Sequence, residues 1–212
     1  MSYLTPALLL RAYAAGIFPM AESRDADVLH WLSPEERGVL LLEKFHLPRR
    51  LRRTYLSGRF EYSADRSFRE VVRLCATVHE TSWINGEIEG LYGELFDSGL
   101  AHSVEVWRGD ELSGGLFGLS LGGVFFGESM FSRERDASKA GLAELVLRLR
   151  SGGYVLMDVQ FWTRHLGQFG VEEVKRGEYL GMLSGGLGCS GVFLSEFSAA
   201  ARLHALGDLI ER

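Results

Sequence analysis

The pattern of hydrophobic and polar positions divides the chain into helices and strands. Apolar residues at helical spacing predict helices over 5–16, 67–75, 88–96, 138–152, 163–169, 178–183 and 195–212. Continuous or alternating apolar runs predict strands over 38–42, 60–63, 103–107, 112–120, 124–130, 154–161 and 192–194. The order strand–strand–strand–helix–strand in the second half predicts an α+β fold, with strand 154–161 beside the three-stranded meander.

One polar residue interrupts the most apolar part of this pattern. Gly122-Gly123 separates two apolar runs and predicts a hairpin between the second and third strands of the meander. Glu128 then follows Phe125 and Phe126 and precedes Met130 and Phe131. A carboxylate in such surroundings costs free energy unless it is paired or used. We therefore expect the functional site at this strand.

A soft boundary near Arg37 follows the proline-ended segment 30–34 and precedes the buried strand at 38–42. The pattern thus suggests a small N-terminal domain over 1–37, a larger domain over 38–194 and a helical tail over 195–212. A chain of 212 residues holds one large or two small domains.

Composition excludes several classes of protein. The formal net charge is −5, so the chain as a whole does not resemble a nucleic-acid-binding protein. Two cysteines give no disulfide framework and fit the reducing cytoplasm. No apolar run is long enough to cross a membrane, and no secretory signal is recognisable.

Charge is nevertheless uneven along the chain. Arg49, Arg50, Arg52 and Arg53 form a basic run within an acidic protein, and such a run could contact phosphates. A solvated helix face also explains the run, and the pattern alone favours that explanation.

Three polar residues form the first candidate for chemistry. Asp158 and Gln160 alternate with apolar residues and are expected on one face of their strand, where they could converge with Glu128 if the two strands are neighbours. Two carboxyl groups and an amide could bind a cation or handle an amine proton. Alternatively, Glu128 pairs with an arginine such as Arg133 and Asp158 caps a helix. We find no dinucleotide-binding glycine motif, no Walker A loop, no nucleophile elbow and no metal-ligand spacing.

An apolar pocket is the second candidate. The hydrophobic residues around the meander and the helix that follows it exceed what one helix–sheet contact needs, so some of them could line a ligand cavity while most form core. The candidates are Leu116, Phe125, Met130, Leu142, Leu145, Leu149 and Met157.

Several motifs, in this order, resemble the leucyl/phenylalanyl-tRNA–protein transferase family over roughly residues 5–185. They are Gly-Ile-Phe-Pro at 16–19, Trp-Leu-Ser-Pro at 31–34, Trp-Ile at 83–84, Ala-His-Ser-Val-Glu-Val-Trp at 101–107, Gly-Gly-Leu-Phe-Gly at 114–118, Gly-Glu-Ser-Met-Phe-Ser at 127–132, Ala-Ser-Lys at 137–139 and Asp-Val-Gln at 158–160.

The resemblance implies a cytoplasmic enzyme of N-end rule protein degradation. Such an enzyme transfers Leu or Phe, and less readily Met, from aminoacyl-tRNA to acceptor proteins with N-terminal Arg or Lys. It implies a small N-terminal domain and an acetyltransferase-like (GNAT-type) mixed sheet with flanking helices. The ester of aminoacyl-tRNA is already activated, so positioning supplies much of the rate, and we expect neither a cofactor nor a metal.

The resemblance also implies roles for individual residues. Asp158 and Gln160 would hold the attacking amine, with Asp158 as proton acceptor or orienter, and Glu128 would lie at the reacting end. The seven apolar candidates would form the amino-acid pocket. Met20 and Trp83 would lie at the 3′ end of the tRNA, and the Arg49–Arg53 run would contact its backbone.

The chain departs from the family at several of these positions. Met20 replaces a tryptophan that stacks on the terminal adenosine, Thr163 replaces an asparagine, and Leu145 and Leu149 replace aromatic pocket residues. Adenosine recognition and donor preference are expected to differ as a result. Two alternative functions are an acyl-CoA-dependent N-acyltransferase, whose glycine-rich pyrophosphate loop is missing from 133–141, and a tRNA-binding protein without catalysis.

Overall fold

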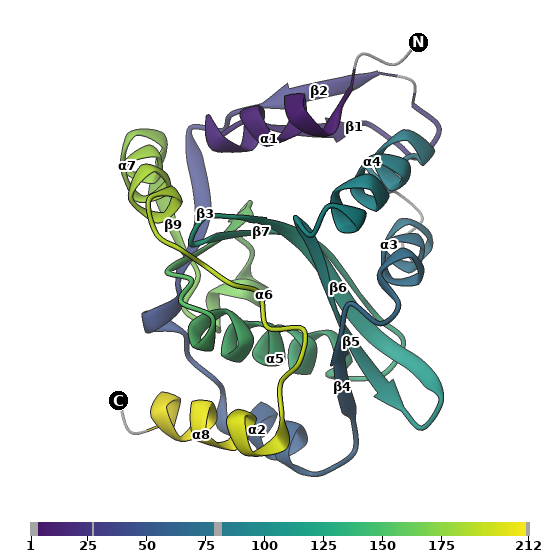
Figure 1. Cartoon of the computed structure of the whole chain (residues 1–212), viewed down its shortest axis with the longest axis vertical. Coiled ribbons are helices and arrows are strands. Elements are labelled where there is room, and N and C mark those ends of the chain that lie inside the picture. The colour runs from purple at the N-terminus through teal and green to yellow at the C-terminus, as the bar shows by residue number, and fades with distance from the viewer. Residues whose placement is uncertain (1–3, 27, 79–81, 211–212) are drawn as a thin grey trace.

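A seven-stranded mixed sheet forms the centre of the computed structural model, which describes residues 4–26, 28–78 and 82–210 (Figure 1). The strand order is β4 (Glu61–Ala64), β5 (Ala101–Arg108), β6 (Glu111–Leu121), β7 (Val124–Ser132), β8 (Leu156–Gln160), β3 (Glu36–Leu41) and β9 (Glu172–Lys175). All neighbouring strands are antiparallel except β7 and β8, which are parallel. Strand β8 therefore lies beside the meander, as the sequence predicts.

Helices cover both faces of this sheet. One face carries α1 (Pro6–Ala14), α3 (Phe68–Thr77), α4 (Gly86–Asp97) and α7 (Arg176–Leu187), and the other carries α5 (Ala137–Ser151) (Figure 1). Below α5 lie α2 (Arg49–Leu56) and α8 (Ala199–Ile210). The chain also forms the short helices η1 (Leu42–Lys44) and α6 (Arg164–Gly167), and the small sheet β1 (Phe18–Ala21) and β2 (Leu29–Leu32).

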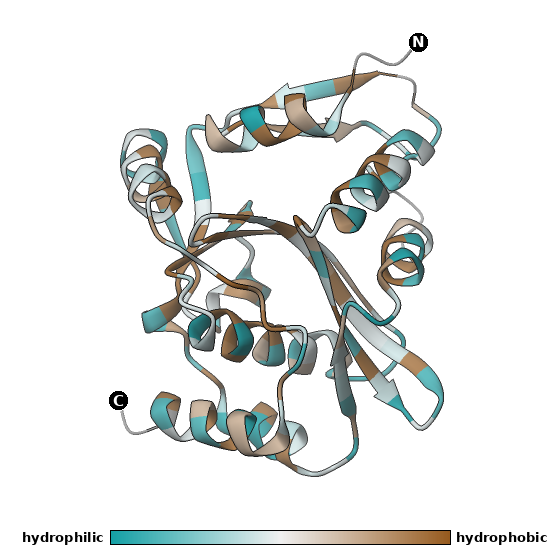
Figure 2. Ribbon diagram, in the orientation of Figure 1, coloured by the Kyte–Doolittle hydropathy of each residue, from teal (hydrophilic) through white to brown (hydrophobic). Residues whose placement is uncertain are grey.

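The sheet separates two hydrophobic cores, and the central strands β6 and β7 contribute to both (Figure 2). One core joins α1, α3, α4 and α7 to the sheet, and it includes the buried Cys75. The other joins α5 to the sheet and to α2 and α8. Among the described residues, no helix is both long and apolar enough to cross a membrane.

Tight turns fix the meander. Gly122 adopts a φ of +56° in the hairpin between β6 and β7, and a β-carbon there would lie 2.5 Å from the carbonyl oxygen of Leu187. Only glycine combines this conformation with so close an approach of the backbone. The predicted hairpin at Gly122-Gly123 is confirmed.

Other details of the sequence prediction are wrong or incomplete. Residues 192–194 do not form a strand, although strands β1, β2 and β9 do exist. These three strands contain only four residues each, too few to show a period of two. The helix expected over 67–75 is present as α3, and its N-cap Ser67 donates its backbone N–H to Glu105 but makes no capping hydrogen bond with its side chain.

The proposed boundary at residue 37 lies inside β3, so the strand that ends the N-terminal part also belongs to the main sheet. The division into 1–37, 38–194 and 195–212 stays a prediction. Within the last segment, α8 is tied to the main body because Arg202 forms an ion pair with the buried Glu144 of α5.

Candidate functional site

The candidate site lies where β7 and β8 separate. The two strands pair only over Val124–Phe126 and Leu156–Asp158. On its other side β7 pairs with β6, and beyond that point this pairing passes over one residue of β7. Gly118 pairs with Gly127 and Phe117 pairs with Ser129, which leaves Glu128 as the extra residue of a β-bulge. A bulge re-aims a side chain at the end of regular pairing, and here it turns Glu128 out of the ladder.

The first cavity occupies the gap between the separated strands and has a volume of about 250 Å³. Strand β7 supplies Glu128 and Met130, β8 supplies Met157 and Gln160, and the segment around α6 closes the far side. Most of the lining is apolar. The full lining is Leu116, Phe117, Gly127, Glu128, Ser129, Met130, Met157, Val159, Gln160, Thr163, His165 and Leu166.

A second cavity of about 210 Å³ adjoins the first and shares five of its residues, including Glu128 and Gln160. Its outer wall comes from the N-terminal part of the chain and from the loop before α4. The lining is Phe18, Pro19, Met20, Trp83, Glu128, Val159, Gln160, Phe161, Thr163 and Leu166. The structure therefore brings Met20 and Trp83 together at one cavity, although 63 positions separate them in the sequence (83 − 20).

A chain of hydrogen bonds holds Glu128 from behind. The hydroxyl of Tyr13 donates to Glu128 Oε1 at 2.7 Å, and the hydroxyls of Tyr13 and Tyr92 lie 2.7 Å apart. Both phenols are fully buried, and they come from α1 and α4. Burial raises the pKa of Glu128 to about 8, helped by the negative charge of Asp158 and opposed by the two phenols and by Arg37.

Asp158 is fully buried and makes its contacts on the side of α7 rather than in either cavity. Arg37 donates from Nε to Oδ1 at 2.9 Å and from Nη2 to Oδ2 at 2.7 Å, and Tyr179 donates to Oδ2 at 2.6 Å. The backbone N–H of Gln160 donates to Oδ1 at 2.8 Å. Four donors thus satisfy this carboxylate, so it is not placed to accept a proton directly from a substrate in either cavity.

Gln160 is held in an unusual conformation and lines both cavities. Its φ is +59°, a left-handed conformation that non-glycine residues rarely adopt, and the bond from its N–H to Asp158 fixes the turn. Its side-chain Nε2 is buried without a hydrogen-bond partner in the described part of the chain. A buried amide without a partner at a cavity wall is suited to a substrate carbonyl or amine.

The structure separates the seven predicted pocket residues into two groups. Leu116, Met130 and Met157 line the first cavity. The other four line neither cavity, because they are buried in the core between the sheet and α5: Phe125, Leu142, Leu145 and Leu149. They form the layer behind Leu116 and Met157, which belong to the same core.

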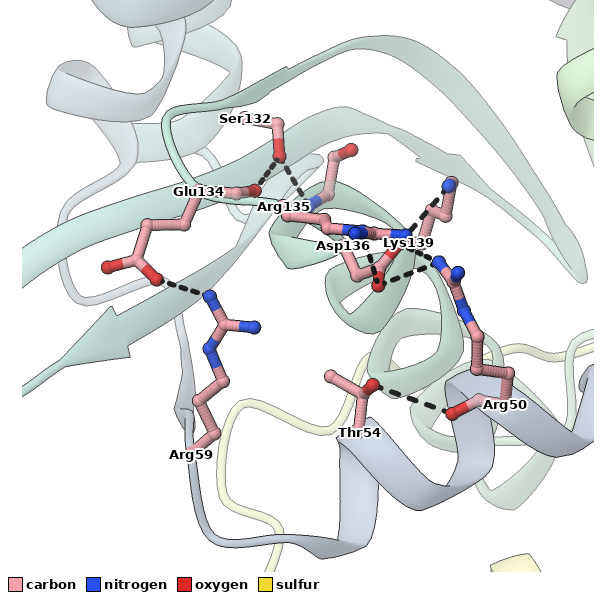
Figure 3. Close-up of polar contacts among 9 residues, drawn as sticks. Arg50, Thr54, Arg59, Ser132, Glu134, Arg135, Asp136 and Lys139 are labelled. Atoms are coloured by element: carbon pink, nitrogen blue, oxygen red, sulfur yellow. Dashed lines mark hydrogen bonds and ion pairs between the residues drawn. The ribbon is translucent and has the colours of Figure 1, made fainter.

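The basic run lies on α2, and Arg49, Arg50 and Arg53 are exposed. Arg50 forms an ion pair with Asp136 at 3.1 Å, and Lys139 contacts the same carboxylate at 3.2 Å (Figure 3). Asp136 precedes α5, and it pairs with these cations rather than capping the helix. Within the described residues, Arg49, Arg52 and Arg53 form no ion pair. They remain available to an anionic partner.

Lys139, which shares Asp136 with Arg50, also acts through its charge on a residue of the first cavity. Burial lowers the pKa of His165, which lines that cavity, and the positive charge of Lys139 lowers it further.

The alternative in which Glu128 pairs with Arg133 is wrong, since Glu128 bonds to Tyr13. The described residues contain no group of three or more His, Cys, Asp or Glu side chains placed to hold a metal ion.

Sequence reasoning missed the residues that support the site from behind. Tyr13 and Tyr92 fit the apolar faces of their helices and look like ordinary core, and Tyr179 likewise lies in an apolar helix. The burial of Arg37 beside the site could not be predicted from the sequence, because a charged residue at the start of a strand is usually exposed. Only its pairing with Asp158, far away in the sequence, explains its burial.

Two family models match this chain. The model described as leucyl/phenylalanyl-tRNA protein transferase matches residues 39–184, and the model of the N-terminal domain of the same transferase matches residues 3–35. A crystal structure of FemX is also similar, with a TM-score of 0.51 at 11% identity, over 79% of this chain and 66% of that one. At this identity the likeness concerns the fold alone, and it confirms the predicted α+β, acetyltransferase-like mixed sheet.

Curated relatives agree with the family models. A leucyl/phenylalanyl-tRNA–protein transferase of Paramagnetospirillum magneticum is 54% identical over 190 residues, which cover 88% of this chain and 91% of the relative. Proteins of the same name from Caulobacter vibrioides and Gluconobacter oxydans are 50% and 48% identical, over 93% and 99% of this chain and 93% and 94% of the relatives. The chain therefore belongs to the leucyl/phenylalanyl-tRNA–protein transferase family.

Proposed function

We propose that this chain transfers Leu or Phe, and less readily Met, from aminoacyl-tRNA to the N-terminal Arg or Lys of acceptor proteins. The observation that carries the proposal is the junction of two cavities at Glu128 and Gln160, where the amide of Gln160 is buried without a partner. Because charged tRNA and N-end rule degradation belong to the cytoplasm, we place the enzyme there.

The first cavity takes the side chain of the donor amino acid. Leu116, Met130 and Met157 provide apolar walls, and about 250 Å³ accommodates Leu, Met or Phe. Discrimination in such a pocket amounts to about 1–3 kcal/mol per methylene, which suits an enzyme that accepts several apolar side chains. The leucines that replace aromatic residues at 145 and 149 lie behind this wall, where they affect its shape rather than contact the donor.

The second cavity takes the terminal adenosine of the tRNA. Trp83 and Phe161 supply aromatic surface, and Met20 supplies a thioether. With the side chain in one cavity and the nucleoside in the other, the ester that joins them lies at the shared wall, beside Gln160 and Glu128. The basic run on α2 then contacts the phosphate backbone of the tRNA.

Gln160 and Asp158 have different roles at the reacting centre. Gln160 hydrogen-bonds the amine or the ester carbonyl through its side chain, while Asp158 fixes the turn that presents it. Asp158 is thus a positioning residue in this proposal. No covalent intermediate is required, because the amine attacks an ester that is already activated and both reactants are held in place.

Transfer of labelled Leu or Phe from charged tRNA to a peptide with N-terminal Arg tests the proposal. Gln160→Ala should lower kcat/KM by on the order of 100-fold, while Glu61→Ala, a change at an exposed residue outside both cavities, should not. Acylation of the peptide from an acyl-CoA, or tight binding of charged tRNA without transfer, would support one of the two alternative functions and contradict this one.

A further inference from the structure

Glu128 is the one carboxyl group among the described residues that line the two cavities. Asp158, the proton acceptor that the family resemblance implies, already accepts hydrogen bonds from four donors and lines neither cavity. Aminolysis of an ester nevertheless needs a group that removes a proton from the attacking nitrogen and returns one to the leaving oxygen. The structure offers Glu128 for this task.

The two phenols behind Glu128 determine which oxygen is free. Tyr13 commits its proton to Oε1 of Glu128 at 2.7 Å, so the hydrogen bond between the phenols is donated by Tyr92. The side chains of α1 and α4 thereby anchor one carboxyl oxygen and leave Oε2 for the cavities. Two other charged groups act on Glu128 through their charges, namely Asp158 on β8 and Arg37 on β3. These two form an ion pair with each other.

Building on the function proposed above, we propose that Glu128 accepts the proton of the attacking α-amine and that Tyr13 and Tyr92 are its positioning residues. The nitrogen lone pair forms the C–N bond to the ester carbonyl, and an N–H proton passes to the free oxygen of Glu128. The C–O bond to the ribose then breaks, and the same proton passes to the ribose oxygen. Glu128 returns to its carboxylate form, and no other reactant is consumed.

The raised pKa of Glu128 suits this task. Burial raises the pKa of Glu128 to about 8, close to the working pH, where a general base is most effective. The amine attacks in its neutral form, and the proton leaves the nitrogen once the C–N bond forms. A carboxylate with an ordinary pKa would be a far weaker base for this proton.

The pH dependence of kcat/KM tests the proposal, with one peptide acceptor used throughout. Activity should rise with pH through about 8, and part of that rise comes from the amine itself. Tyr13→Phe removes a donor that stabilises the carboxylate, so the pKa of Glu128 rises and the ascending limb moves to higher pH by about one unit. Tyr92→Phe should move it in the same direction by less, because Tyr13 lowers the pKa of Glu128 more than Tyr92 does.

Glu128→Gln cannot titrate and should lower kcat by on the order of 100-fold or more. Tyr154→Phe is the matched control: it removes a buried phenol hydroxyl, bonded to Ser120, that lies outside both cavities, and its profile should equal that of the wild type. Circular dichroism and thermal unfolding confirm that each variant is folded.

The outcomes are distinguishable. Transfer by the wild type with an unshifted limb in Tyr13→Phe overturns the role given to the phenols. A Glu128→Gln variant that keeps kcat and only raises KM for aminoacyl-tRNA overturns proton transfer, because Glu128 then merely binds the donor's ammonium group. Absence of any transfer by the wild type defeats the proposed function itself, and this inference with it.

Discussion

Arg37→Met tests whether the buried ion pair behind the site holds the fold and the catalytic turn together. Arg37 is 1% exposed and Asp158 is not exposed at all. The guanidinium is bonded to both oxygens of Asp158, and it lies 4.4 Å from the ring centre of Phe18 and 4.7 Å from that of Tyr179. Methionine keeps the apolar contacts and removes the charge.

The expected loss is large because the partner remains. Removing one member of a buried ion pair leaves an uncompensated charge and costs about 3–5 kcal/mol. For a domain of this size, a loss of that magnitude lowers the melting temperature by roughly 6–20 °C. Because Asp158 also holds the N–H of Gln160, transfer activity should fall by on the order of 100-fold through misplacement of the amide.

Thermal unfolding and steady-state transfer of the same preparations provide the assay. The double variant Arg37→Met/Asp158→Asn removes both charges, so it should recover most of the stability without recovering activity. The Arg24→Met variant is the matched control, since Arg24 forms, within the described residues, just one ion pair, a surface contact with Glu89 at 3.7 Å. A single variant within 1 °C of the wild type, or a double variant no more stable than the single one, would refute the reasoning.

Three further predictions follow from the site. The carboxyl of Glu128 has a raised pKa in the folded state, so the wild type loses stability as pH rises from about 4.5 to about 8. Glu128→Gln avoids this loss and should be more stable than the wild type at pH 9 by up to about 5 kcal/mol, with no difference at pH 4, in urea unfolding. Met20→Trp adds a stacking surface at the second cavity and should tighten binding of charged tRNA by about 1 kcal/mol. An unchanged Kd would show that the terminal adenosine does not bind in that cavity. Replacing Arg49, Arg52 and Arg53 by Gln should weaken tRNA binding and reduce the slope of log K against log salt by about two to three, while an unchanged slope would show that α2 only faces solvent.

The sheet and most helices can be predicted from local patterns in the sequence. The Gly122-Gly123 hairpin, the meander and the apolar face of α3 each depend on residues within a few positions of one another. Glu128 could be singled out for the same reason, as a carboxyl group in an apolar run. By contrast, β9 and the β1–β2 pair are too short to show a period, and they form only because the rest of the sheet and α1 pack against them.

The support of the site could not be predicted, because it depends on long-range pairing. Asp158 was expected to face the substrate, and only the approach of Arg37 and Tyr179 from β3 and α7 shows that its acceptors are occupied. Likewise, the register shift opposite Glu128 is a property of two strands together. The apolar residues of α5 belong to the core, although the sequence predicts them in a pocket, because composition cannot separate the wall of a cavity from the core behind it.

The central claim is that this chain forms a peptide bond at the junction of the two cavities. The most direct measurement incubates the wild-type chain and Gln160→Ala with leucyl-tRNA labelled in the amino acid and with a peptide that begins with Arg, and follows the label into the peptide by mass spectrometry. We predict a peptide extended by one leucine at its N-terminus with the wild type and on the order of 100-fold slower extension with the variant. A wild-type reaction in which leucyl-tRNA is lost only by hydrolysis, or a variant as active as the wild type, would contradict the account.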